Sequence, residues 1–368
     1  MLQAEYSAPK GSAQHQVLSL REAKAWRQRL ESLPRPMQDV YASPEYYSLY
    51  VSEHVQAECF VYEENGQVIV YPYLKSNINV LGLAELKGQF FDIEGVYGYN
   101  GLLSNTDDSA FFKGFSRAFA KYCEKANIVT EFARLNPIFF NENLRNHWDV
   151  RKVNKNVIVD LTQSEEDLWM RSYEHCVRKN VNKAKRSNLR VCFFYGGQLD
   201  EKHLRAFLKI YLSTMDRHET SGFYYFDKAY FEKLCRLLPR QSLFFFAFNG
   251  REAVSCELVL LSQENAYSFL GGTLADAQAL RPNNILKHEI ILTLKKMGFQ
   301  KYCLGGGKTM DDGIFRYKRT FAKDGEVDFY IGKKVHNPKI YNRLCEQWTK
   351  KFPEKEKSFE NYVLKYRY

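Results

Sequence analysis

The sequence contains two Asn-Gly pairs, each flanked by short apolar runs, and these pairs constrain the fold more than any other feature. The first is Asn65-Gly66, between the runs 57–62 and 68–75, and the second is Asn249-Gly250, between 243–248 and 253–261. Asn-Gly between two strand-like runs is a strong signal for a β-hairpin, because both residues tolerate positive φ. The sequence therefore predicts an antiparallel hairpin in each half of the chain.

The elements predicted around each hairpin repeat in the same order, which is helix, hairpin, strand ending in glycines, helix and strand. After the hairpin of the first half we predict a strand at 94–103, a helix from 107 or 108 to 125 and a strand at 129–136. After the hairpin of the second half we predict a strand at 266–271, a helix at 284–297 and a strand at 301–304. Other predicted helices are 18–33, 45–53, 165–185, 201–217 and 227–238, with a strand at 189–195 and one more helix in the tail. The repetition predicts an internal duplication of architecture, although residue identity between the halves is faint.

A helix, an antiparallel hairpin and a β-α-β unit together describe a mixed sheet flanked by helices. We therefore expect an α/β (mixed α+β) fold of two tandem acetyltransferase-like (GNAT) domains, each with a mixed twisted sheet, although other α/β folds fit the same pattern. A chain of 368 residues is long enough for two domains. We predict a flexible N-terminal arm at 1–16, domains at 17–153 and 154–335, and a C-terminal helix within 336–368 that packs back on the first domain.

The formal net charge of +10 favours anionic partners such as phosphates, nucleotides or RNA. The eight cysteines are scattered and form no C-x-x-C pair, which is typical of a reducing compartment and argues against a zinc site. The N-terminus has no apolar signal segment, and no apolar run reaches about 18 residues. We expect a cytoplasmic protein with no membrane span, no metal and no permanently bound cofactor.

One glycine-rich segment, 302–322, has the features of a ligand site. Gly305, Gly306 and Gly307 follow a predicted buried strand and precede Lys308, and the basic-aromatic cluster 315–321 comes next. Consecutive glycines let the chain turn sharply and let another group approach closely. The alternative interpretation is a β-turn followed by a solvated run of charges.

The loop before the predicted helix 284–297 bears on the identity of the ligand. In simple acetyltransferases a glycine-rich loop and the helix N-terminus at this point hold the pyrophosphate of coenzyme A. Here the loop 273–284 has no glycine, although Arg281 can meet a phosphate and Asn283 can cap the helix. The corresponding loop of the first half, 102–108, lacks the glycine pattern and ends in acidic residues that repel phosphate, so the first half is a poor site for coenzyme A.

Two further segments carry candidate binding residues. The basic run 171–186 predicts a phosphate-binding surface whose affinity falls as salt rises, or alternatively a solvated helix face; its candidate residues are Arg178, Lys179, Lys183 and Arg186. The segment 214–226 ends a helix before a glycine-containing turn, where ligand contacts are frequent; its candidate residues are Arg217, His218, Tyr224 and Tyr225. A cation at a helix C-terminus also simply favours the helix dipole, and the sequence pairs no nucleophile with His218.

Several segments together resemble the FemABX-like aminoacyltransferases and their acetyltransferase relatives. In the second half these segments are T-M-D-R-H-E-T-S-G-F-Y-Y-F, R-P-N-N-I-L-K-H-E, Y-C-L-G-G-G-K-T, D-G-I-F-R-Y-K-R-T-F and the basic segment 177–191. In the first half they are Y-G-Y-N-G, which contains Tyr99, and F-A-R-L-N-P. The resemblance covers about 17–331, and the order of the motifs carries it more than any single motif.

The resemblance implies acyl transfer to an amine, which in the peptidoglycan-bridge enzymes runs from aminoacyl-tRNA to the lysine of a cell-wall precursor. It places Tyr317 and Lys318 as the aromatic-lysine pair of the acyl-transfer channel, with Tyr where Phe is common. The chain lacks the coiled-coil insertion of the glycine-adding members, which leaves the tRNA donor open. Shorter relatives include proteins thought to modify sugars of surface polysaccharides.

We therefore expect an acyltransferase with Lys318 stabilising charge that develops on the carbonyl or leaving oxygen. The donor is a co-substrate, either aminoacyl-tRNA, which the basic helix and the glycine-free loop slightly favour, or acyl-CoA. The acceptor is an amine of a cell-envelope precursor or nucleotide sugar. Two alternatives stay open: an acyl-CoA-dependent N-acetyltransferase of surface polysaccharide biosynthesis, and a non-catalytic RNA- or nucleotide-binding protein on a degenerate transferase fold.

Overall fold

The computed structural model describes residues 13–218 and 222–368, which form two compact units. The first unit contains 13–37, Tyr50–Arg151 and Ile331–Tyr368, and the second contains Gln38–Leu49 and Lys152–Tyr330. The segment Gln38–Leu49 thus packs with the second unit, although it precedes most of the first unit in the chain. Most of the predicted arm at 1–16 lies outside the described residues, and its last part, from Gln14, begins a paired strand.

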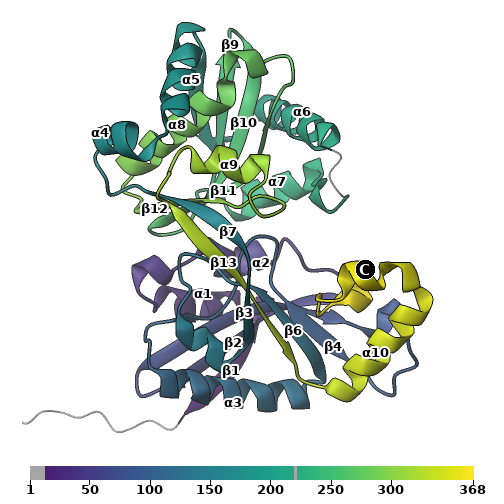
Figure 1. Cartoon of the computed structure of the whole chain (residues 1–368). Helices are drawn as coiled ribbons and strands as arrows, with labels where there is room; N and C mark the ends of the chain where they lie inside the picture. Colours follow the sequence, from purple (N-terminus) through teal and green to yellow (C-terminus); the bar gives the residue numbers. More distant parts are fainter. Residues whose placement is uncertain (1–12, 219–221) are drawn as a thin grey trace, which may run out of the picture. The chain divides into compact units, whose positions relative to one another are not determined.

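The first unit is a sheet covered by helices (Figure 1). Its strands are β1 (Gln14–Ser19), β2 (Val55–Glu64), β3 (Gln67–Asn77), β4 (Phe91–Glu94), β5 (Leu103–Ser104) and β6 (Ile128–Arg134), together with the end of β13 (Glu326–Val335), and its main helices are α1 (Ala23–Glu31), α3 (Ser109–Lys125) and α10 (Pro338–Lys351), with the short α11 (Glu356–Phe359). The path order of the paired strands is β1-β2-β3-β4-β6-β13. Only β4 and β6 pair in parallel; the other pairs described are antiparallel.

Two cores stabilise the first unit, one on each face of its sheet. On one face Phe115 and Phe119 of α3 pack against Phe60 of β2 and Tyr71 of β3. On the other, residues of α10 and the C-terminal turns surround Phe132 of β6, and the Thr130 hydroxyl contacts that of Tyr366. The segment after Ile331 therefore supplies a large part of this unit's hydrophobic core.

The second unit repeats the arrangement of the first. Its strands are β8 (Arg190–Tyr195), β9 (Ser242–Asn249), β10 (Glu252–Leu261), β11 (Asn265–Thr273), β12 (Lys301–Gly305) and the second part of β7 (Asp149–Asp160), and its helices are α2 (Pro44–Tyr47), α4 (Glu165–Asp167), α5 (His175–Arg186), α6 (Glu201–Arg217), α7 (Lys228–Leu237), α8 (Pro282–Lys296) and α9 (Gly313–Arg319). The strands follow the order β7-β12-β11-β10-β9-β8, in which only β11 and β12 pair in parallel.

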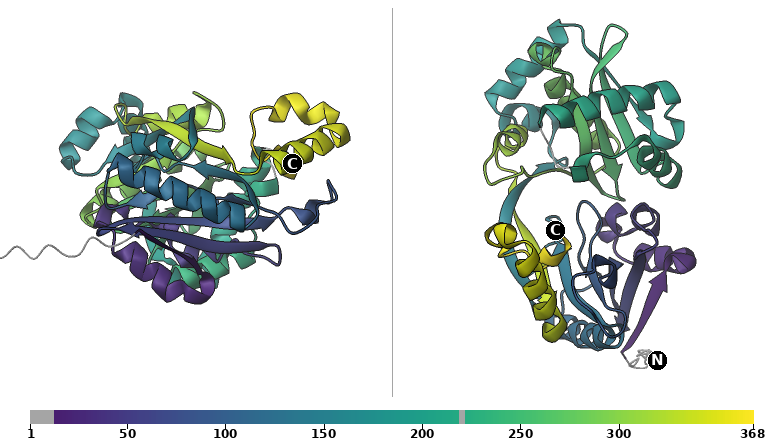
Figure 2. Two further views of the ribbon diagram at one scale, coloured as in Figure 1. Left: turned by 90° about the horizontal axis from the view of Figure 1, so that it is seen from below. Right: turned by 90° about the vertical axis from the view of Figure 1, so that its right-hand side faces the viewer.

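Helices cover both faces of the second sheet (Figure 2). On strand β9, Phe245 lies in the core with α5 and α8, whereas Phe244 packs against Phe207 of α6, with ring centroids 5.1 Å apart. Aspartate side chains cap the first turns of α6, α7 and α9, which is why these helices begin where the sequence places an acid before an apolar run. No helix among the described residues is long and apolar enough to cross a membrane.

The expected mixed fold with GNAT-like tandem domains is confirmed. Two strands, β7 and β13, each begin in one unit and end in the other. Strand β7 leaves the first unit and pairs with β12 of the second, from Val157↔Gly305 to Asp160↔Lys301. Strand β13 runs the other way and pairs with β6 of the first unit, from Ile331↔Arg134 to Val335↔Thr130. Strand β7 thus runs from the first unit into the second, and β13 runs from the second unit back into the first.

Several predicted elements differ from the structure. The helix expected at 165–185 is interrupted by a π-helical turn, Leu168–Ser172, and by the extended residue Tyr173. The strand expected at 94–103 is a loop between β4 and β5, because Gly98 and Gly101 take positive φ. The boundary expected between residues 153 and 154 lies close to the division of the two units, which falls between Arg151 and Lys152 inside the continuous strand β7.

The two hairpins also differ in detail. Asn65 and Gly66 both have positive φ and form the loop between β2 and β3 as expected. In the second hairpin Asn249 is the last residue of β9 and pairs with Glu252, so the loop is Gly250-Arg251. Gly250 alone is in the positive-φ region there, as a turn with glycine first requires.

Candidate active site in the second unit

The parallel strands β11 and β12 pair only at their beginnings. Their register runs from Asn265↔Lys301 to Tyr267↔Cys303. Beyond these residues β11 stays paired with β10 as far as Thr273, and β12 stays paired with β7 as far as Gly305. The carboxyl ends of neighbouring parallel strands are the place where ligands bind in open α/β sheets.

In the first unit, the loop after β4 occupies the equivalent position at the end of the parallel pair β4 and β6. After β4 the chain returns to β6, where Asn100 N–H donates to Arg134 O at 2.8 Å and Arg134 N–H donates to Asn100 Oδ1 at 2.7 Å. A side chain at Gly95 would collide with that of Asn100, at 2.2 Å. The predicted site residue Tyr99 lies in this loop and belongs to the first unit, whereas the other predicted site residues belong to the second.

A buried cluster of polar side chains lies where β11 and β12 stop pairing. Glu257 of β10 accepts hydrogen bonds from Lys287 Nζ, at 2.5 Å on each oxygen, from Ser268 Oγ at 2.7 Å and from the Tyr302 hydroxyl. Glu257 is 8% exposed, Lys287 4% and Tyr302 0%. Burial lowers the pKa of Lys287, and the Glu257 carboxylate opposes that change. The result is an ion pair whose hydrogen bonds are satisfied inside the unit.

Helix α9 brings Tyr317 and Lys318 to the same place. The Tyr317 hydroxyl donates to Asn283 O at 3.1 Å, in the first turn of α8, and Lys318 Nζ donates to Gly306 O at 2.6 Å. Burial, and then the nearby charge of Lys287, lower the pKa of Lys318 to about 8. Lys318 is thus a partly buried amine, held by a backbone carbonyl, whose pKa lies below the ordinary value for lysine.

The three glycines form a tight loop that fits its surroundings closely. Gly305 has φ +75°, and a Cβ at Gly306 would lie 2.5 Å from Lys155 O. Asp312 organises the loop, because its carboxylate accepts from Lys308 N–H at 2.6 Å and from Phe315 N–H at 2.8 Å. Lys308, predicted as a ligand residue, therefore contributes its backbone to the loop, and its side chain is exposed.

Helix α8 starts earlier than expected. Its N-cap is Arg281, which has φ +63°, and Pro282 occupies the first helical position, so Asn283 lies in the first turn and does not cap the helix. Proline favours this position because its φ is already helical and its missing N–H is not needed there. Arg281 is exposed beside this helix N-terminus, as a phosphate contact requires.

The last residue of α6 contacts the end of β11, and the segment after this helix carries the other predicted residues. Arg217 NH1 donates to Thr273 O at 2.9 Å. His218 caps the helix with its backbone and is exposed. Tyr224 O accepts from the Tyr211 hydroxyl, and the Tyr225 hydroxyl donates to Asp216 Oδ1 at 3.0 Å. Both tyrosines therefore hold the segment after α6 against that helix.

The basic residues of α5 divide into two groups. Arg178 NH1 donates to Tyr173 O at 2.7 Å and to Trp169 O at 3.1 Å, so it stabilises the π-helical turn inside the unit. Lys179, Lys183 and Arg186 are exposed and follow one face of the helix, opposite its buried residues. Of the four candidate residues predicted from the sequence, these three remain available for a phosphate backbone, and we call them the α5 stripe.

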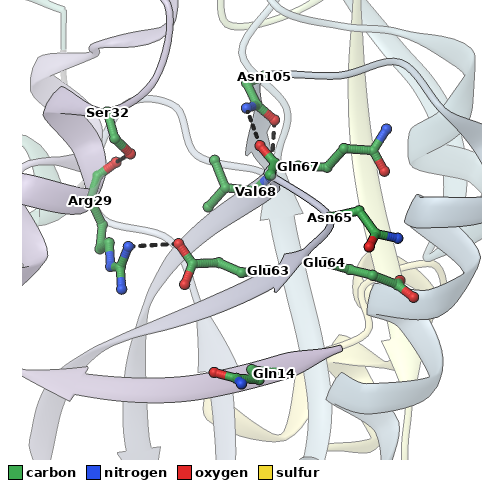
Figure 3. Close-up of a pocket in the computed structure, with 10 residues that line it drawn as sticks. Gln14, Arg29, Ser32, Glu63, Glu64, Asn65, Gln67, Val68 and Asn105 are labelled. Atoms are coloured by element: carbon green, nitrogen blue, oxygen red, sulfur yellow. Dashed lines mark hydrogen bonds and ion pairs between the residues drawn. The ribbon is translucent and has the colours of Figure 1, made fainter. Parts of the chain in front are cut away.

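Two cavities lie in the first unit and contain none of the predicted site residues. One, of about 440 Å³, is lined in part by the Asn65-Gly66 turn and by the Arg29–Glu63 ion pair at 2.6 Å (Figure 3). The other, of about 520 Å³, is lined in part by Trp148 and Lys334. Neither cavity is lined by a glycine loop and a buried lysine like those of the candidate site in the second unit.

Behind the second cavity lies a buried polar cluster centred on Glu131. Its carboxylate accepts from Tyr71 at 2.7 Å, His147 at 3.0 Å, Trp148 at 2.6 Å and His336 at 2.8 Å. Lys334 Nζ, 3.4 Å from His147 Nδ1, can donate only to an unprotonated ring nitrogen. These contacts saturate the carboxylate, which identifies the cluster as part of the core.

Sequence reasoning missed the Glu257–Lys287 pair, although the sequence carries a signal for it. Glu257 is the one charge in the run A-V-S-C-E-L-V-L-L, and Lys287 follows the apolar pair I-L on a helix with a buried face. Charged residues are almost never fully buried unless they are paired. A charge inside each of two buried elements therefore indicates a partner.

The comparisons with known proteins agree with this architecture. Residues 175–319 match the family model of the acetyltransferase (GNAT) domain, and a search of curated proteins by sequence gives no match. The solved structure of FemX aligns with a TM-score of 0.65 and 13% identity, over 89% of this chain and 99% of that chain.

Two other solved structures align over the same shares, 89% of this chain and 99% of theirs, each at 8% identity. One is a conserved protein of unknown function from Bacteroides thetaiotaomicron VPI-5482, with a TM-score of 0.53, and the other is a tandem GNAT protein from the clavulanic acid biosynthesis pathway, with a TM-score of 0.50. Identities this low establish the fold. The chain therefore has the fold of two tandem GNAT-like units, similar to that of FemX, and its match to the GNAT domain model lies in the second unit.

Proposed function

We propose that this protein is an acyltransferase that joins an activated acyl group to an amine, with its reaction centre in the second unit. The observation that carries the proposal is the convergence of Lys318, the Gly306 loop and the first turn of α8 at the end of the paired part of β11 and β12. The amine attacks an ester or thioester carbonyl, and the protein's contribution is to position both partners and to stabilise the developing oxyanion.

We further propose aminoacyl-tRNA as the donor, with acyl-CoA as the second candidate. The α5 stripe supports a polyanionic donor, since its three cations are exposed on one helix face. The loop before α8 lacks the glycines that bring several N–H groups to a pyrophosphate, although the exposed Arg281 keeps acyl-CoA in the comparison. The proposed acceptor, an amine of a cell-envelope precursor or nucleotide sugar, rests on the FemABX-like resemblance of the sequence.

One experiment separates these possibilities. The purified full-length protein is titrated with tRNA and with acetyl-CoA, and acyl transfer from aminoacyl-tRNA and from acetyl-CoA is then measured with amine acceptors of both classes. We expect saturable transfer from aminoacyl-tRNA. Transfer from acetyl-CoA alone would favour the CoA-dependent enzyme, and tight binding of either ligand with no transfer would favour a non-catalytic binding protein.

A further inference from the structure

The buried cluster around Glu131 in the first unit extends through His147 to a serine. Ser116 Oγ lies 3.2 Å from His147 Nδ1, and His147 Nε2 lies 3.0 Å from Glu131 Oε1. The carboxylate end belongs to the core, whereas Ser116 at the other end is half-buried. A hydroxyl, an imidazole and a carboxylate in this order have the connectivity of a catalytic triad, which is recognised by geometry and not by sequence position.

Separate elements bring these side chains together on the face of the sheet that α3 covers. Ser116 lies in the middle of α3, Glu131 lies in β6, and His147 follows the short turn Glu142–Asn146. Lys334 of β13 pairs directly with Glu131, so their side chains lie on the same face of the sheet. Lys334 Nζ donates to Ser116 Oγ at 3.2 Å, which places a cation beside the hydroxyl.

The hydrogen bonds of the cluster are consistent with one direction of proton donation. Trp148 Nε1 can only donate and lies 2.6 Å from Glu131 Oε1, so this oxygen is an acceptor and His147 Nε2 is the protonated ring nitrogen. His147 Nδ1 then carries a lone pair that can accept the Ser116 proton. Lys334 is 3.4 Å from Nδ1 and closer to the serine oxygen, so it leaves the hydroxyl proton for the imidazole. Burial lowers the pKa of His147 and favours the same neutral form.

The second cavity of the first unit, of about 520 Å³, lies against this group. His147 and Lys334 line it, together with the aromatic side chains of Trp148, Tyr341 and Tyr362. Ser116 Oγ is within hydrogen-bond distance of both polar residues, so a carbonyl group in the cavity can approach it. The volume is typical of small-molecule sites, which combine apolar walls with a few polar groups. A small ester with an aryl or alkyl part suits this lining.

We propose that the first unit contains a catalytic centre of its own, which hydrolyses small carboxylic esters with Ser116 as nucleophile, His147 as base and Lys334 as the cation that stabilises the oxyanion. Glu131 is the positioning residue that orients His147. A preorganised charge beside the developing oxyanion is commonly the largest catalytic contribution. The inference does not rest on the proposed function, because it needs no acceptor amine and no residue of the second unit.

The reaction balances with water as the only co-reactant. Ser116 Oγ forms a bond to the ester carbonyl carbon while its proton passes to His147 Nδ1. The bond from that carbon to the alcohol oxygen breaks, and the imidazolium gives its proton to this oxygen, so the alcohol leaves and an acyl-serine remains. Water then attacks the acyl-serine with the same two proton transfers, which releases the carboxylic acid and restores the serine.

Labelling with a fluorophosphonate tests the nucleophile in the full-length protein. An activated serine forms a P–O bond to this probe and fluoride leaves, and peptide mass spectrometry locates the label. We expect a label at Ser116 and none in Ser116→Ala. Ser109→Ala is the matched control, because Ser109 lies about two turns earlier on α3 and accepts a hydrogen bond from Asn146 Nδ2 at 3.1 Å.

The role of Lys334 is tested by the rate of the same labelling. Lys334→Met removes the cation beside the oxyanion, so the rate at Ser116 should fall by about 10²–10³. Lys334→Arg keeps the charge and should recover most of this loss. A rate in Lys334→Met within about twofold of wild type overturns the assignment of this residue as the oxyanion cation.

The pH dependence of labelling reports on the base. The groups that face the ring of His147 are Glu131 of β6, Tyr71 of β3, and Lys334 and His336 of β13. Because burial lowers the pKa of His147, the neutral ring is the form present at pH 7. The rate should therefore be constant near pH 7 and fall only below about pH 6.5, the ordinary value for histidine. A rate that rises in proportion to hydroxide indicates an ordinary hydroxyl and overturns the triad.

Ester hydrolysis is the second measurement. With para-nitrophenyl acetate we expect a burst of nitrophenolate followed by steady turnover, both lost in Ser116→Ala and kept in Ser109→Ala. A thermal melt of each variant shows that the fold is retained. The absence of a label at Ser116, under conditions that label a known serine esterase, overturns the inference. Hydrolysis that persists in Ser116→Ala, or labelling at Ser116 with no hydrolysis, overturns it as well.

Discussion

At the scale of single residues, Lys318 combines a site position with a small structural role. Its nitrogen has the carbonyl of Gly306 as acceptor, so Lys318→Met removes the amine while it keeps most of the aliphatic volume. We expect kcat to fall by about 10²–10³, as for the loss of one charge-stabilising donor, with little change in Tm. Single-turnover rates and a thermal melt measure both. A rate within about twofold of wild type would contradict the assignment.

Glu131 provides a test of stability in the first unit. Burial opposes its charge, but His147 and then His336 outweigh burial and hold the pKa of Glu131 well below its ordinary value. Burial also lowers the pKa of His147. Both folded-state pKa values lie below the unfolded ones, so unfolding takes up protons, and stability should fall as pH drops from about 6.5, the ordinary value for histidine, through about 4.3, that of glutamate.

Glu131→Gln should lower the free energy of unfolding at pH 7 by about 3 kcal/mol, since four donors lose a charged acceptor. It should also flatten the fall in stability below about pH 4.5, where the wild-type carboxylate would otherwise take up a proton. Urea unfolding at pH 7, 5.5 and 4 measures both effects. Equal pH dependence in wild type and variant would show that this carboxylate is not the titrating group.

The candidate site could be predicted where it depends on local sequence, and not where it depends on pairing in space. Tyr317, Lys318 and the glycines lie within one short segment, so a motif was enough to group them. Glu257 and Lys287 come from a strand and a helix whose alignment no local pattern specifies. Arg178 was grouped with its basic neighbours because its contacts to backbone carbonyls are not visible in the sequence.

At the scale of elements, the glycine loop after β12 offers a matched pair of substitutions. Gly306→Ala would bring a Cβ within 2.5 Å of Lys155 O and 2.7 Å of Asn156 Oδ1, whereas a Cβ at Gly313 meets nothing within 4 Å. Gly306→Ala should therefore displace the carbonyl that holds Lys318 and reduce kcat at least about tenfold, because misplacement of about 1 Å can cost more than that. Gly313→Ala should leave kcat unchanged, and a similar loss in both variants would show that the loop has no specific geometry to protect.

The α5 stripe makes a separate prediction about the donor. Replacing Lys179, Lys183 and Arg186 by Gln should weaken tRNA binding and reduce the slope of log K against log salt by up to about three, roughly one for each lost phosphate contact. The matched control replaces three exposed cations of α6, Lys202, Arg205 and Lys209. Binding isotherms at several salt concentrations measure the slopes. Equal effects of the two triple variants would mean that only net charge matters.

Elements defined by short-range signals were predictable. The hairpin turns carry their own glycines, and α3 carries Asp108, which accepts from Ala110 N–H at 2.8 Å. Strands β7 and β13 were not predicted, because each joins two environments. In β7 the first part is largely exposed and charged, whereas Val157 and Val159 are buried, so no single periodicity runs through the strand.

At the scale of the whole molecule, the order of the sequence is not the order of the fold. A fragment ending at Arg151 lacks the end of β13 and the C-terminal residues Leu344, Trp348 and Tyr366, which belong to the first unit's core. We expect this fragment to lack a cooperative unfolding transition, and a peptide spanning 326–368 to restore one when added. Circular dichroism during urea titration tests this. A cooperative transition in the fragment alone would mean that the C-terminal segment is dispensable.

The crossing of β7 and β13 has a consequence for how the protein is made. The chain leaves the ribosome from its N-terminus, so β7 is available before the strands of the second unit that it joins, and that unit can complete its sheet as soon as β12 emerges. The first unit must keep the edge of β6 uncovered until β13 and α10 have been synthesised, an interval on the order of ten to forty seconds at ordinary elongation rates. The half that is translated first is the half that finishes folding last, and during that interval its unpaired strand edge can pair with other chains.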